Sequence, residues 1–151
     1  MTSSDKLLVV DDNKDQQGLV QGILKGVLSR DQILYATDGI EGLKTALTER
    51  PRLILTDLNM HQMNGDRLIV ELRKEQGYLP HIVLSSDRSL DLLLSNKKEY
   101  AIDDQVKVLI QDGEIDFLPK SFDFNVYSKA LEALVGRYLL PADTATQRFS
   151  S

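Results

Sequence analysis

The chain has 151 residues, 42% of them hydrophobic, with a net charge of −5 at pH 7 and no cysteine. This length suffices for one domain with a real core. The acidic balance argues against a nucleic-acid-binding surface, and the absence of thiols excludes disulfides, zinc–thiolate sites and thiol catalysis. Because no apolar run reaches membrane-spanning length and the N-terminal MTSSDK lacks a signal-peptide core, we expect a soluble, cytoplasmic protein without a membrane partner.

Short apolar runs alternate with amphipathic segments along the chain. The runs predict buried strands at residues 6–10, 32–36, 52–56, 80–84 and 114–118. The segments predict helices at residues 15–29, 40–48, 65–76 and 124–140. In the first and last helices, Leu19 and Val126 are among the residues expected to face inward. This alternation predicts an α/β fold, a doubly wound five-stranded parallel sheet with helices on both faces. Residues 1–141 are expected to form one domain, followed by a polar, disordered tail at 142–151.

Polar side chains follow the expected strands where the strands end. In chain order they are Asp11 and Asp12, Asp57, Ser85 and Ser86, and Lys120. Asp57 alone would fit a turn or a helix cap, but right-handed crossovers bring all these strand ends to one edge of the sheet. Three carboxylates so close repel one another unless a cation joins them, and Mg²⁺ prefers oxygen ligands beside phosphate. Lysine and hydroxyl groups suit phosphoryl oxygens, and an Asp beside Mg²⁺ can attack phosphorus.

These segments together resemble the receiver domain of bacterial two-component response regulators, the CheY-like superfamily. LLVVDDN is similar to the family's acidic pair after the first strand, and TDLNMHQMNG to its phosphoacceptor segment. HIVLSS is similar to its fourth strand, and DGEIDFLPKSF to the segment that carries its lysine. The resemblance covers about residues 5–140 and implies the flavodoxin-like receiver fold.

The resemblance also implies a phosphotransfer function that depends on Mg²⁺. A sensor histidine kinase, or a histidine phosphotransfer protein, would supply the phosphoryl group, and Asp57 would accept it. Asp12 and Asp57 would ligate Mg²⁺ through their side chains and Asn59 through its backbone carbonyl. Asp11 would assist, partly through water. The function implied is a phosphorylation-switched signalling module rather than an enzyme with a turnover substrate.

Other positions are implied to hold and to sense the phosphoryl group. Ser85 and Lys120 would bind its oxygens, and Ser86 offers a second hydroxyl at the same strand end. Movement of Ser85 would free space for Phe117, the switch aromatic, and so change a surface that partners read. The two positions expected to tune hydrolysis of the acyl phosphate are Asn59 and Asp87.

The sequence departs from the family pattern at four places. His61 stands where the family usually has Pro, which we attribute to loop tolerance rather than to proton transfer. Ser86 replaces the usual Ala. Lys120 is followed by Ser121 rather than by the Pro whose peptide bond is typically cis. A cis bond without Pro costs about 3 kcal/mol, so Lys120–Ser121 is expected to be either strained or trans.

The fourth departure is an expected insertion around residues 87–104, because the spacing from Ser85 to Lys120 exceeds the family's by about a dozen residues. Leucines at 90, 93 and 94 and apolar residues at 106, 109 and 110 predict two helical pieces, the second being the family's fourth helix. A single long helix is the alternative. We interpret the insertion as a surface elaboration rather than a lid, with buried leucines that shield a dimerisation face and keep the protein monomeric.

Two other functions are compatible with the sequence. A pseudo-receiver would keep the fold and bind partners without phosphorylation, which the lost Pro after Lys120 slightly favours. A Mg²⁺-dependent phosphatase with an Asp nucleophile would usually carry a second Asp where Asn59 stands. Only ten residues follow Pro141, too few for a DNA-binding output domain, so either the receiver acts alone or the chain is part of a longer protein.

Overall fold

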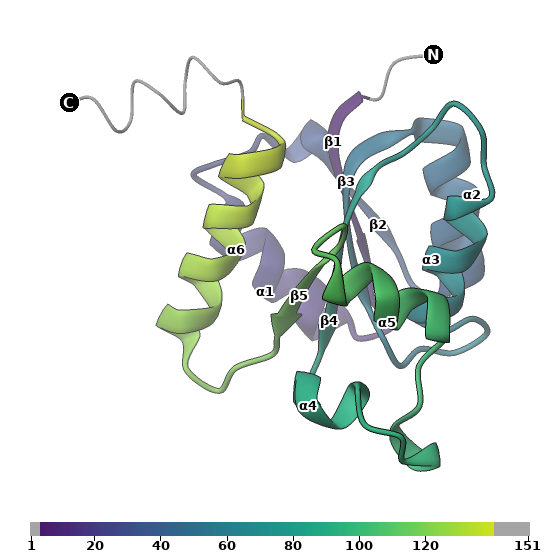
Figure 1. Cartoon of the computed structure of the whole chain (residues 1–151). Helices are drawn as coiled ribbons and strands as arrows, with labels where there is room; N and C mark the ends of the chain where they lie inside the picture. Colours follow the sequence, from purple (N-terminus) through teal and green to yellow (C-terminus); the bar gives the residue numbers. More distant parts are fainter. Residues whose placement is uncertain (1–3, 141–151) are drawn as a thin grey trace.

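The computed structural model describes residues 4–140, in which a five-stranded sheet lies between two layers of helices (Figure 1). The strands are β1 (Ser4–Val10), β2 (Ile33–Ala36), β3 (Pro51–Asp57), β4 (His81–Ser86) and β5 (Asp116–Pro119). All neighbouring strands are parallel, in the order β2-β1-β3-β4-β5, so the expected fold is confirmed. The expected tail, 142–151, lies outside the described residues. No helix between residues 4 and 140 is long and apolar enough to cross a membrane.

The helices cover both faces of the sheet; all but the last connect successive strands, and the last follows the final strand. They are α1 (Lys14–Leu24), α2 (Gly39–Glu49), α3 (Gly65–Arg73), α4 (Leu90–Leu93), α5 (Asp104–Gln111) and α6 (Phe124–Tyr138), with 3₁₀ turns η1 (Arg30–Gln32) and η2 (Lys98–Tyr100). Several begin at polar caps that follow a strand end. The Asn13 side chain accepts hydrogen bonds from the N–H groups of Asp15 and Gln16 at the start of α1, and Asp123 caps α6 in the same way.

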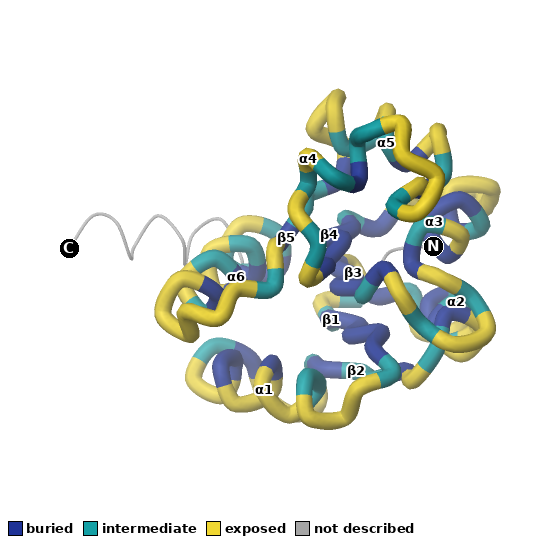
Figure 2. The backbone as a smooth tube through the Cα atoms, turned by 90° about the horizontal axis from the view of Figure 1, so that it is seen from below, coloured by how far each residue is buried: buried dark blue, intermediate teal, exposed yellow. Residues whose placement is uncertain are grey.

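Alternation of side chains along the strands divides the core into two layers. On β1, Leu7 and Val9 pack with residues of α1 and α6, whereas Leu8 and Val10 pack with residues of α2, α3 and α5. The central strands are therefore buried on both faces, as Figure 2 shows by their dark colour. Burial on both faces explains why these strands are nearly continuous apolar runs in the sequence.

Two helices differ from the sequence-based expectation. Helix α1 ends at Leu24 rather than near Ser29, and Leu19 is 38% exposed. In α6, Val126 is 57% exposed and Tyr127 is buried instead. The buried residues of α6 repeat every fourth position from Tyr127, and this register places the large aromatic ring against the sheet. The inward positions predicted at 19 and 126 were wrong because neighbouring apolar residues permit more than one register.

The segment between β4 and β5 forms two separate helices, as expected, rather than one long helix. Leu93 of α4 is buried in the core, but its leucine neighbours at 90, 92 and 94 are only half-buried, so the expected burial is confirmed for Leu93 and wrong for the other three. One contact within the segment and one with α3 fix its position. The Arg88 guanidinium lies 4.7 Å from the centre of the Tyr100 ring, and the Asp103 N–H donates to Asp66 Oδ2 at 2.9 Å. That this segment is an insertion relative to the family stays a prediction.

Candidate acidic site at the carboxyl edge of the sheet

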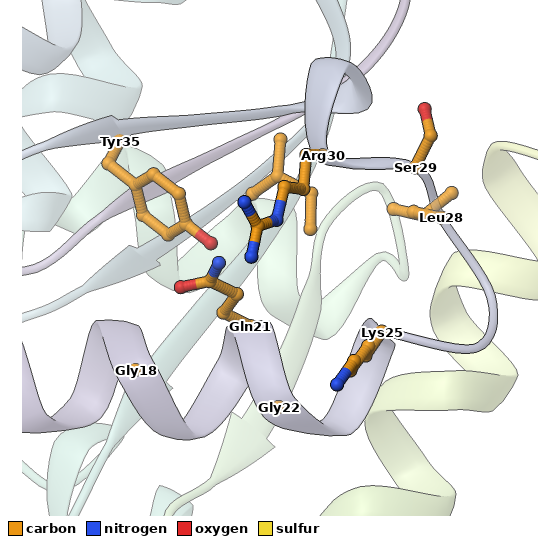
Figure 3. A pocket seen from close by; sticks show the side chains of 9 residues that line it. Gly18, Gln21, Gly22, Lys25, Leu28, Ser29, Arg30 and Tyr35 are labelled. Atoms are coloured by element: carbon orange, nitrogen blue, oxygen red, sulfur yellow. The ribbon is translucent and has the colours of Figure 1, made fainter.

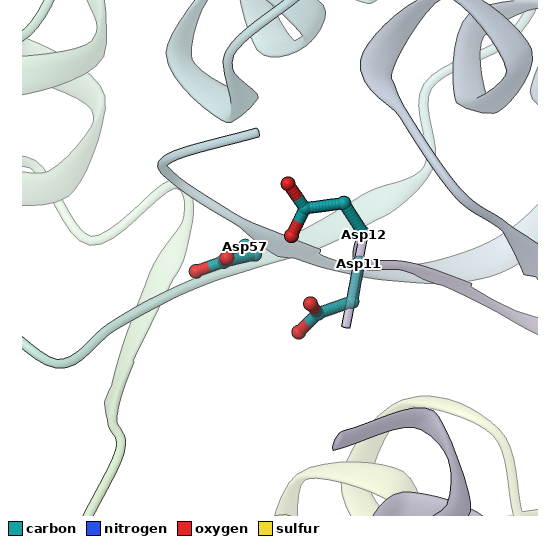
Figure 4. A group of neighbouring side chains, drawn as sticks. All are labelled: Asp11, Asp12 and Asp57. Carbon is teal, nitrogen blue, oxygen red and sulfur yellow. The ribbon is translucent and has the colours of Figure 1, made fainter. Parts of the chain in front are cut away.

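Three carboxylates meet where β1 and β3 end (Figure 4). Asp11, Asp12 and Asp57 each offer an oxygen atom, and these atoms all lie within 4.8 Å of one another. The register explains their proximity, because Val10 pairs with Thr56 and the next residue of each strand is an aspartate. The side chains of Asp11 and Asp57 are 5% and 12% exposed, and that of Asp12 is 26% exposed. The cluster is thus partly desolvated and still open to solvent on one side.

A lysine that directly follows β5, at the same edge of the sheet, completes the site. Lys120 Nζ lies 3.3 Å from Asp11 Oδ2 and 3.2 Å from Asp57 Oδ1. It is positioned by its backbone, since the Lys120 N–H donates to the carbonyl of Ser86 at 2.9 Å. The structure therefore brings together the acidic residues and the lysine that the strand ends predicted.

Burial and charge together set the protonation of these groups. Burial raises the pKa of Asp57 to about 6; the nearby Lys120 opposes this shift and the nearby Asp11 adds to it. Burial by itself would lower the pKa of Lys120, but the carboxylates of Asp57 and Asp11 outweigh it, and the pKa is raised. At neutral pH the lysine is charged and Asp57 is mostly ionised, which suits a carboxylate nucleophile.

The two adjacent serines of β4 have different surroundings. Ser85 pairs with Asp57 in the sheet register, and its Oγ is buried without a hydrogen-bond partner among the described residues. Ser86 Oγ accepts a hydrogen bond from the Arg88 N–H at 3.0 Å. Strand alternation places Ser85 on the same side of the sheet as the site and Ser86 on the side of Phe117. Only the Ser85 hydroxyl is thus available to a group bound beside Asp57.

The donor set fits a hard divalent cation and a phosphoryl group. The three carboxylates match the oxygen ligands that Mg²⁺ prefers. The unpartnered Ser85 hydroxyl and the Lys120 ammonium supply donors for phosphoryl oxygens. Of the two positions expected to tune hydrolysis, Asn59 is exposed and lines a small pocket with Arg88. Asp87 is also exposed and forms no hydrogen bond to the cluster within residues 4–140.

Tyr127 is a residue at the site that the sequence interpretation missed. It is 3% exposed and lines a narrow cavity together with Asp57, Ser85 and Lys120. Gln16 Nε2 donates to its hydroxyl at 3.0 Å, and burial raises the pKa of Tyr127 to about 12. Its spacing of four residues from Leu131 was the signal that could have placed it inward. Tyr127 closes the site on the side of α6 with a hydroxyl that stays protonated.

Two departures from the family pattern lie at or next to the site. His61 is 90% exposed, and its Nε2 lies 3.7 Å from Asp12 Oδ2 at the rim of the site. No cis peptide bond occurs among residues 4–140, so the Lys120–Ser121 bond is trans. Lys120 nevertheless reaches both Asp11 and Asp57, and the missing Pro does not displace it.

Similarity to known proteins extends over most of the chain. The family model described as response regulator receiver domain matches residues 7–132. The transcriptional regulatory protein PrrA of Mycobacterium tuberculosis is 32% identical over 135 residues, which are 89% of this chain and 52% of PrrA. The chemotaxis protein CheY homolog of Campylobacter jejuni is 28% identical over 134 residues, covering 87% of this chain and 92% of that protein. The chain thus spans about half the length of PrrA and nearly all of the CheY homolog.

Solved structures show the same architecture. The two component transcriptional regulator AraC from Clostridium phytofermentans superposes with a TM-score of 0.60 at 30% identity, covering 87% of this chain and 92% of that one. The signal receiver domain of a LuxO repressor protein from Vibrio parahaemolyticus superposes with a TM-score of 0.65 at 20% identity, covering 87% and 90% of the two chains. The second likeness bears on the fold alone.

Proposed function

Because this chain belongs to the response regulator receiver domain family, we propose that it accepts a phosphoryl group on Asp57 and signals by changing how partners bind. One observation carries this proposal. Lys120 Nζ lies 3.2 Å from Asp57 Oδ1 inside a cluster of three carboxylates, beside the unpartnered hydroxyl of Ser85. Receiver domains take phosphoryl groups from histidine kinases, and we propose such a kinase or a histidine phosphotransfer protein as the partner here.

In the transfer step, an Asp57 carboxylate oxygen attacks phosphorus. The new oxygen–phosphorus bond forms as the phosphorus–nitrogen bond of the phosphohistidine breaks, and the histidine ring leaves with the electron pair. Lys120 exchanges its ion pair with Asp57 for one with a phosphoryl oxygen, and the Ser85 hydroxyl donates to another. Bound Mg²⁺, held by the three carboxylates and the Asn59 carbonyl, would neutralise charge on the phosphoryl oxygens.

The switch is proposed to pass from β4 to β5. A phosphoryl group on Asp57 draws the Ser85 hydroxyl toward it, and Ser85 pairs with Leu118 of β5 in the sheet register. Phe117 lies on the opposite side of β5, half-buried against the core beneath α5. A shift of β4 therefore reaches a side chain near the surface of that layer. Partners respond only as far as they bind the two arrangements differently.

Magnesium is expected to stabilise the fold. The clustered carboxylates repel one another when no cation is bound. Mg²⁺ that binds them in the folded state therefore relieves this repulsion and raises the free energy of unfolding by mass action. At ten times the dissociation constant the gain is about 1.4 kcal/mol, which corresponds to roughly 3 to 5 °C in the thermal midpoint. Differential scanning fluorimetry with MgCl₂ and with chelator measures the shift.

The Asp12→Ala variant is expected to lose most of the magnesium-induced shift. Asp104→Ala removes a carboxylate whose side chain is 99% exposed on α5, far from the cluster in sequence, and serves as the matched control. It is expected to respond to MgCl₂ like the wild type. Coincident midpoints of the wild type with and without Mg²⁺ would contradict the proposed metal site.

The two serines are expected to differ in phosphorylation rate. Ser85→Ala removes a hydrogen bond to a charged oxygen, which is worth about 1.5 to 3 kcal/mol, so labelling is expected to slow by roughly ten- to a hundredfold. Ser86→Ala removes a hydroxyl that already accepts from the Arg88 N–H, and the labelling rate is expected to change little. Intact mass followed over time with phosphoramidate and Mg²⁺ gives both rates. Equal slowing in the two variants, or slowing in Ser86→Ala alone, would refute this assignment.

A further inference from the structure

A second pocket lies between α1 and the edge strand β2, away from the acidic site (Figure 3). Its volume is about 640 Å³, within the range of cavities that hold small organic molecules. Apolar side chains and helix backbone form part of its wall, and a few polar groups converge on it from α1, η1 and β2. This combination is typical of a ligand site.

One wall of the pocket is helix backbone without side chains. Gly18 and Gly22 lie one turn apart on α1, and a Cβ atom built on either would meet nothing within 4 Å. The packing of this chain therefore does not require glycine at these positions, although glycine weakens a helix interior. What the two glycines provide is a flat surface against which a planar ring can lie in close contact.

One buried polar atom of the pocket lacks a hydrogen-bond partner, and the exposed side chain of Gln21 lies beside it. The Tyr35 hydroxyl oxygen is buried without a hydrogen-bond partner among the described residues, and it points toward Gln21 in Figure 3. Burial raises the pKa of Tyr35, so its hydroxyl remains a donor at neutral pH. The Gln21 amide forms no hydrogen bond within residues 4–140 either. A buried hydroxyl left unpaired is costly, and a bound ligand would offset that cost.

Two cations line the same pocket. Lys25 follows the end of α1 and Arg30 begins η1, and both are exposed. Neither forms an ion pair within the part of the chain that the structure describes. Two cations without carboxylate partners in a chain of net charge −5 favour an anionic ligand. Arginine in particular suits the planar oxygens of a carboxylate or the oxygens of a phosphate.

We propose that the pocket between α1 and β2 binds a small planar aromatic anion, with its ring on the Gly18–Gly22 surface and its phosphate or carboxylate between Lys25 and Arg30. The Tyr35 hydroxyl and the Gln21 amide bind polar atoms at the edge of the ring. A nucleoside monophosphate and an aromatic carboxylate share this chemistry, and both fit the volume. The proposal is independent of phosphorylation at Asp57.

The experiment compares AMP, indole-3-acetate and inorganic phosphate by titration of the ¹⁵N-labelled protein. At least one of the two aromatic anions is expected to give saturable shifts at the amides of Gly18, Gly22 and Tyr35, with a dissociation constant at least tenfold below that of phosphate. Tighter binding of AMP identifies the nucleotide class, and tighter binding of indole-3-acetate the carboxylate class.

Variants separate the wall, the cations and the hydroxyl. Gly22→Leu fills the pocket, and Arg30→Gln removes one cation. Each is expected to weaken binding of the tighter-binding aromatic anion at least tenfold. Tyr35→Phe is expected to weaken binding of the same anion several-fold. The controls are Lys44→Gln on α2 and Gly136→Leu on α6, which change a cation and a glycine outside the pocket and are expected to bind like the wild type.

Three results would overturn the proposal. The first is that neither aromatic anion saturates. The second is that inorganic phosphate binds as tightly as AMP and indole-3-acetate do, which would mean that the pocket recognises charge alone and not the aromatic ring. The third is that folded Gly22→Leu, Arg30→Gln and Tyr35→Phe all bind like the wild type. Circular dichroism of each variant confirms folding, and if Gly22→Leu fails to fold, Arg30→Gln and Tyr35→Phe decide the outcome.

Discussion

The Asp57→Asn variant is expected to take no label from acetyl phosphate and Mg²⁺ under conditions in which the wild type gains one phosphoryl group. An amide oxygen is a far weaker nucleophile than a carboxylate, and no other carboxylate of the cluster combines the burial of Asp57 with its place opposite Ser85. Intact mass after a fixed time measures the label. Asp104→Asn changes an exposed carboxylate of α5; it is the matched control and is expected to keep full labelling. Stoichiometric label on another residue of Asp57→Asn would end the assignment.

The same variant is expected to be more stable than the wild type at pH 7 when Mg²⁺ is chelated. The pKa of Asp57 is about 6 in the folded protein, mainly because of burial, against an ordinary value of 3.8. The folded state therefore binds this proton more tightly than the unfolded state does. The resulting stabilisation is fully present below pH 3.8 and is lost as the pH rises through about 6.

Removal of this charge is worth up to about 3 kcal/mol at pH 7, a net figure because the shifted pKa of Asp57 already includes the opposing effect of Lys120. The stability difference between Asp57→Asn and the wild type should shrink as the pH falls toward 4, where the wild-type carboxyl is protonated in the folded state. Urea unfolding of both proteins in chelator across this pH range tests the expectation. A difference that stays constant with pH would show that Asp57 is not responsible.

The second large effect is expected at Gly65, the first residue of α3. A Cβ atom there would clash with the carbonyl oxygen of Asp57 and approach the Cα of Leu58 to 3.2 Å. The Gly65 N–H also donates to the Leu58 carbonyl at 2.8 Å, which holds the two segments together. Gly65→Ala is therefore expected to destabilise the fold by about 2 to 3 kcal/mol. Because the clash falls on the backbone of Asp57, phosphorylation is expected to slow as well.

Gly18→Ala is the matched control for this prediction. Gly18 lies inside a helix, and a Cβ atom there meets open space, so alanine is expected to stabilise α1 by up to about 1 kcal/mol. Urea denaturation of the two variants beside the wild type measures both effects. Similar midpoints for Gly65→Ala and the wild type would mean that the loop after β3 relaxes without cost.

The parts of the site that lie on strand ends were predictable from sequence. Parallel strands have a side-chain period of two and end at the same edge, so the strand pattern alone brings Asp11, Asp57, Ser85 and Lys120 together. The same alternation places Ser85 on the side of the site and Ser86 on the other side, but the hydrogen bond from the Arg88 N–H to Ser86 Oγ was not predictable. That contact arises only when the following loop has folded.

The helices were less predictable than the strands. Val126 and Tyr127 are both apolar enough to face a core, and the local pattern does not decide between them. The packing of α6 against the sheet decides, by placing the tyrosine ring beside the acidic site. The position of the segment between β4 and β5 was likewise not predictable, because it depends on contacts between residues distant in sequence, such as that between Asp103 and Asp66.

The short edge strand β5 has a consequence for the order in which the sheet opens. It has four residues and pairs only with β4 within the described sheet, whereas β1 and β3 pair on both sides. Amide hydrogens of β5 are therefore expected to exchange with solvent through local fraying, whereas those of β1 and β3 are expected to exchange only through global unfolding. The two edge strands, β5 and the equally short β2, are thus less costly to detach than β1 and β3, and β5 is the one that carries Phe117 and leads to Lys120. The edge of the sheet that carries Phe117 can therefore rearrange while the central strands stay paired.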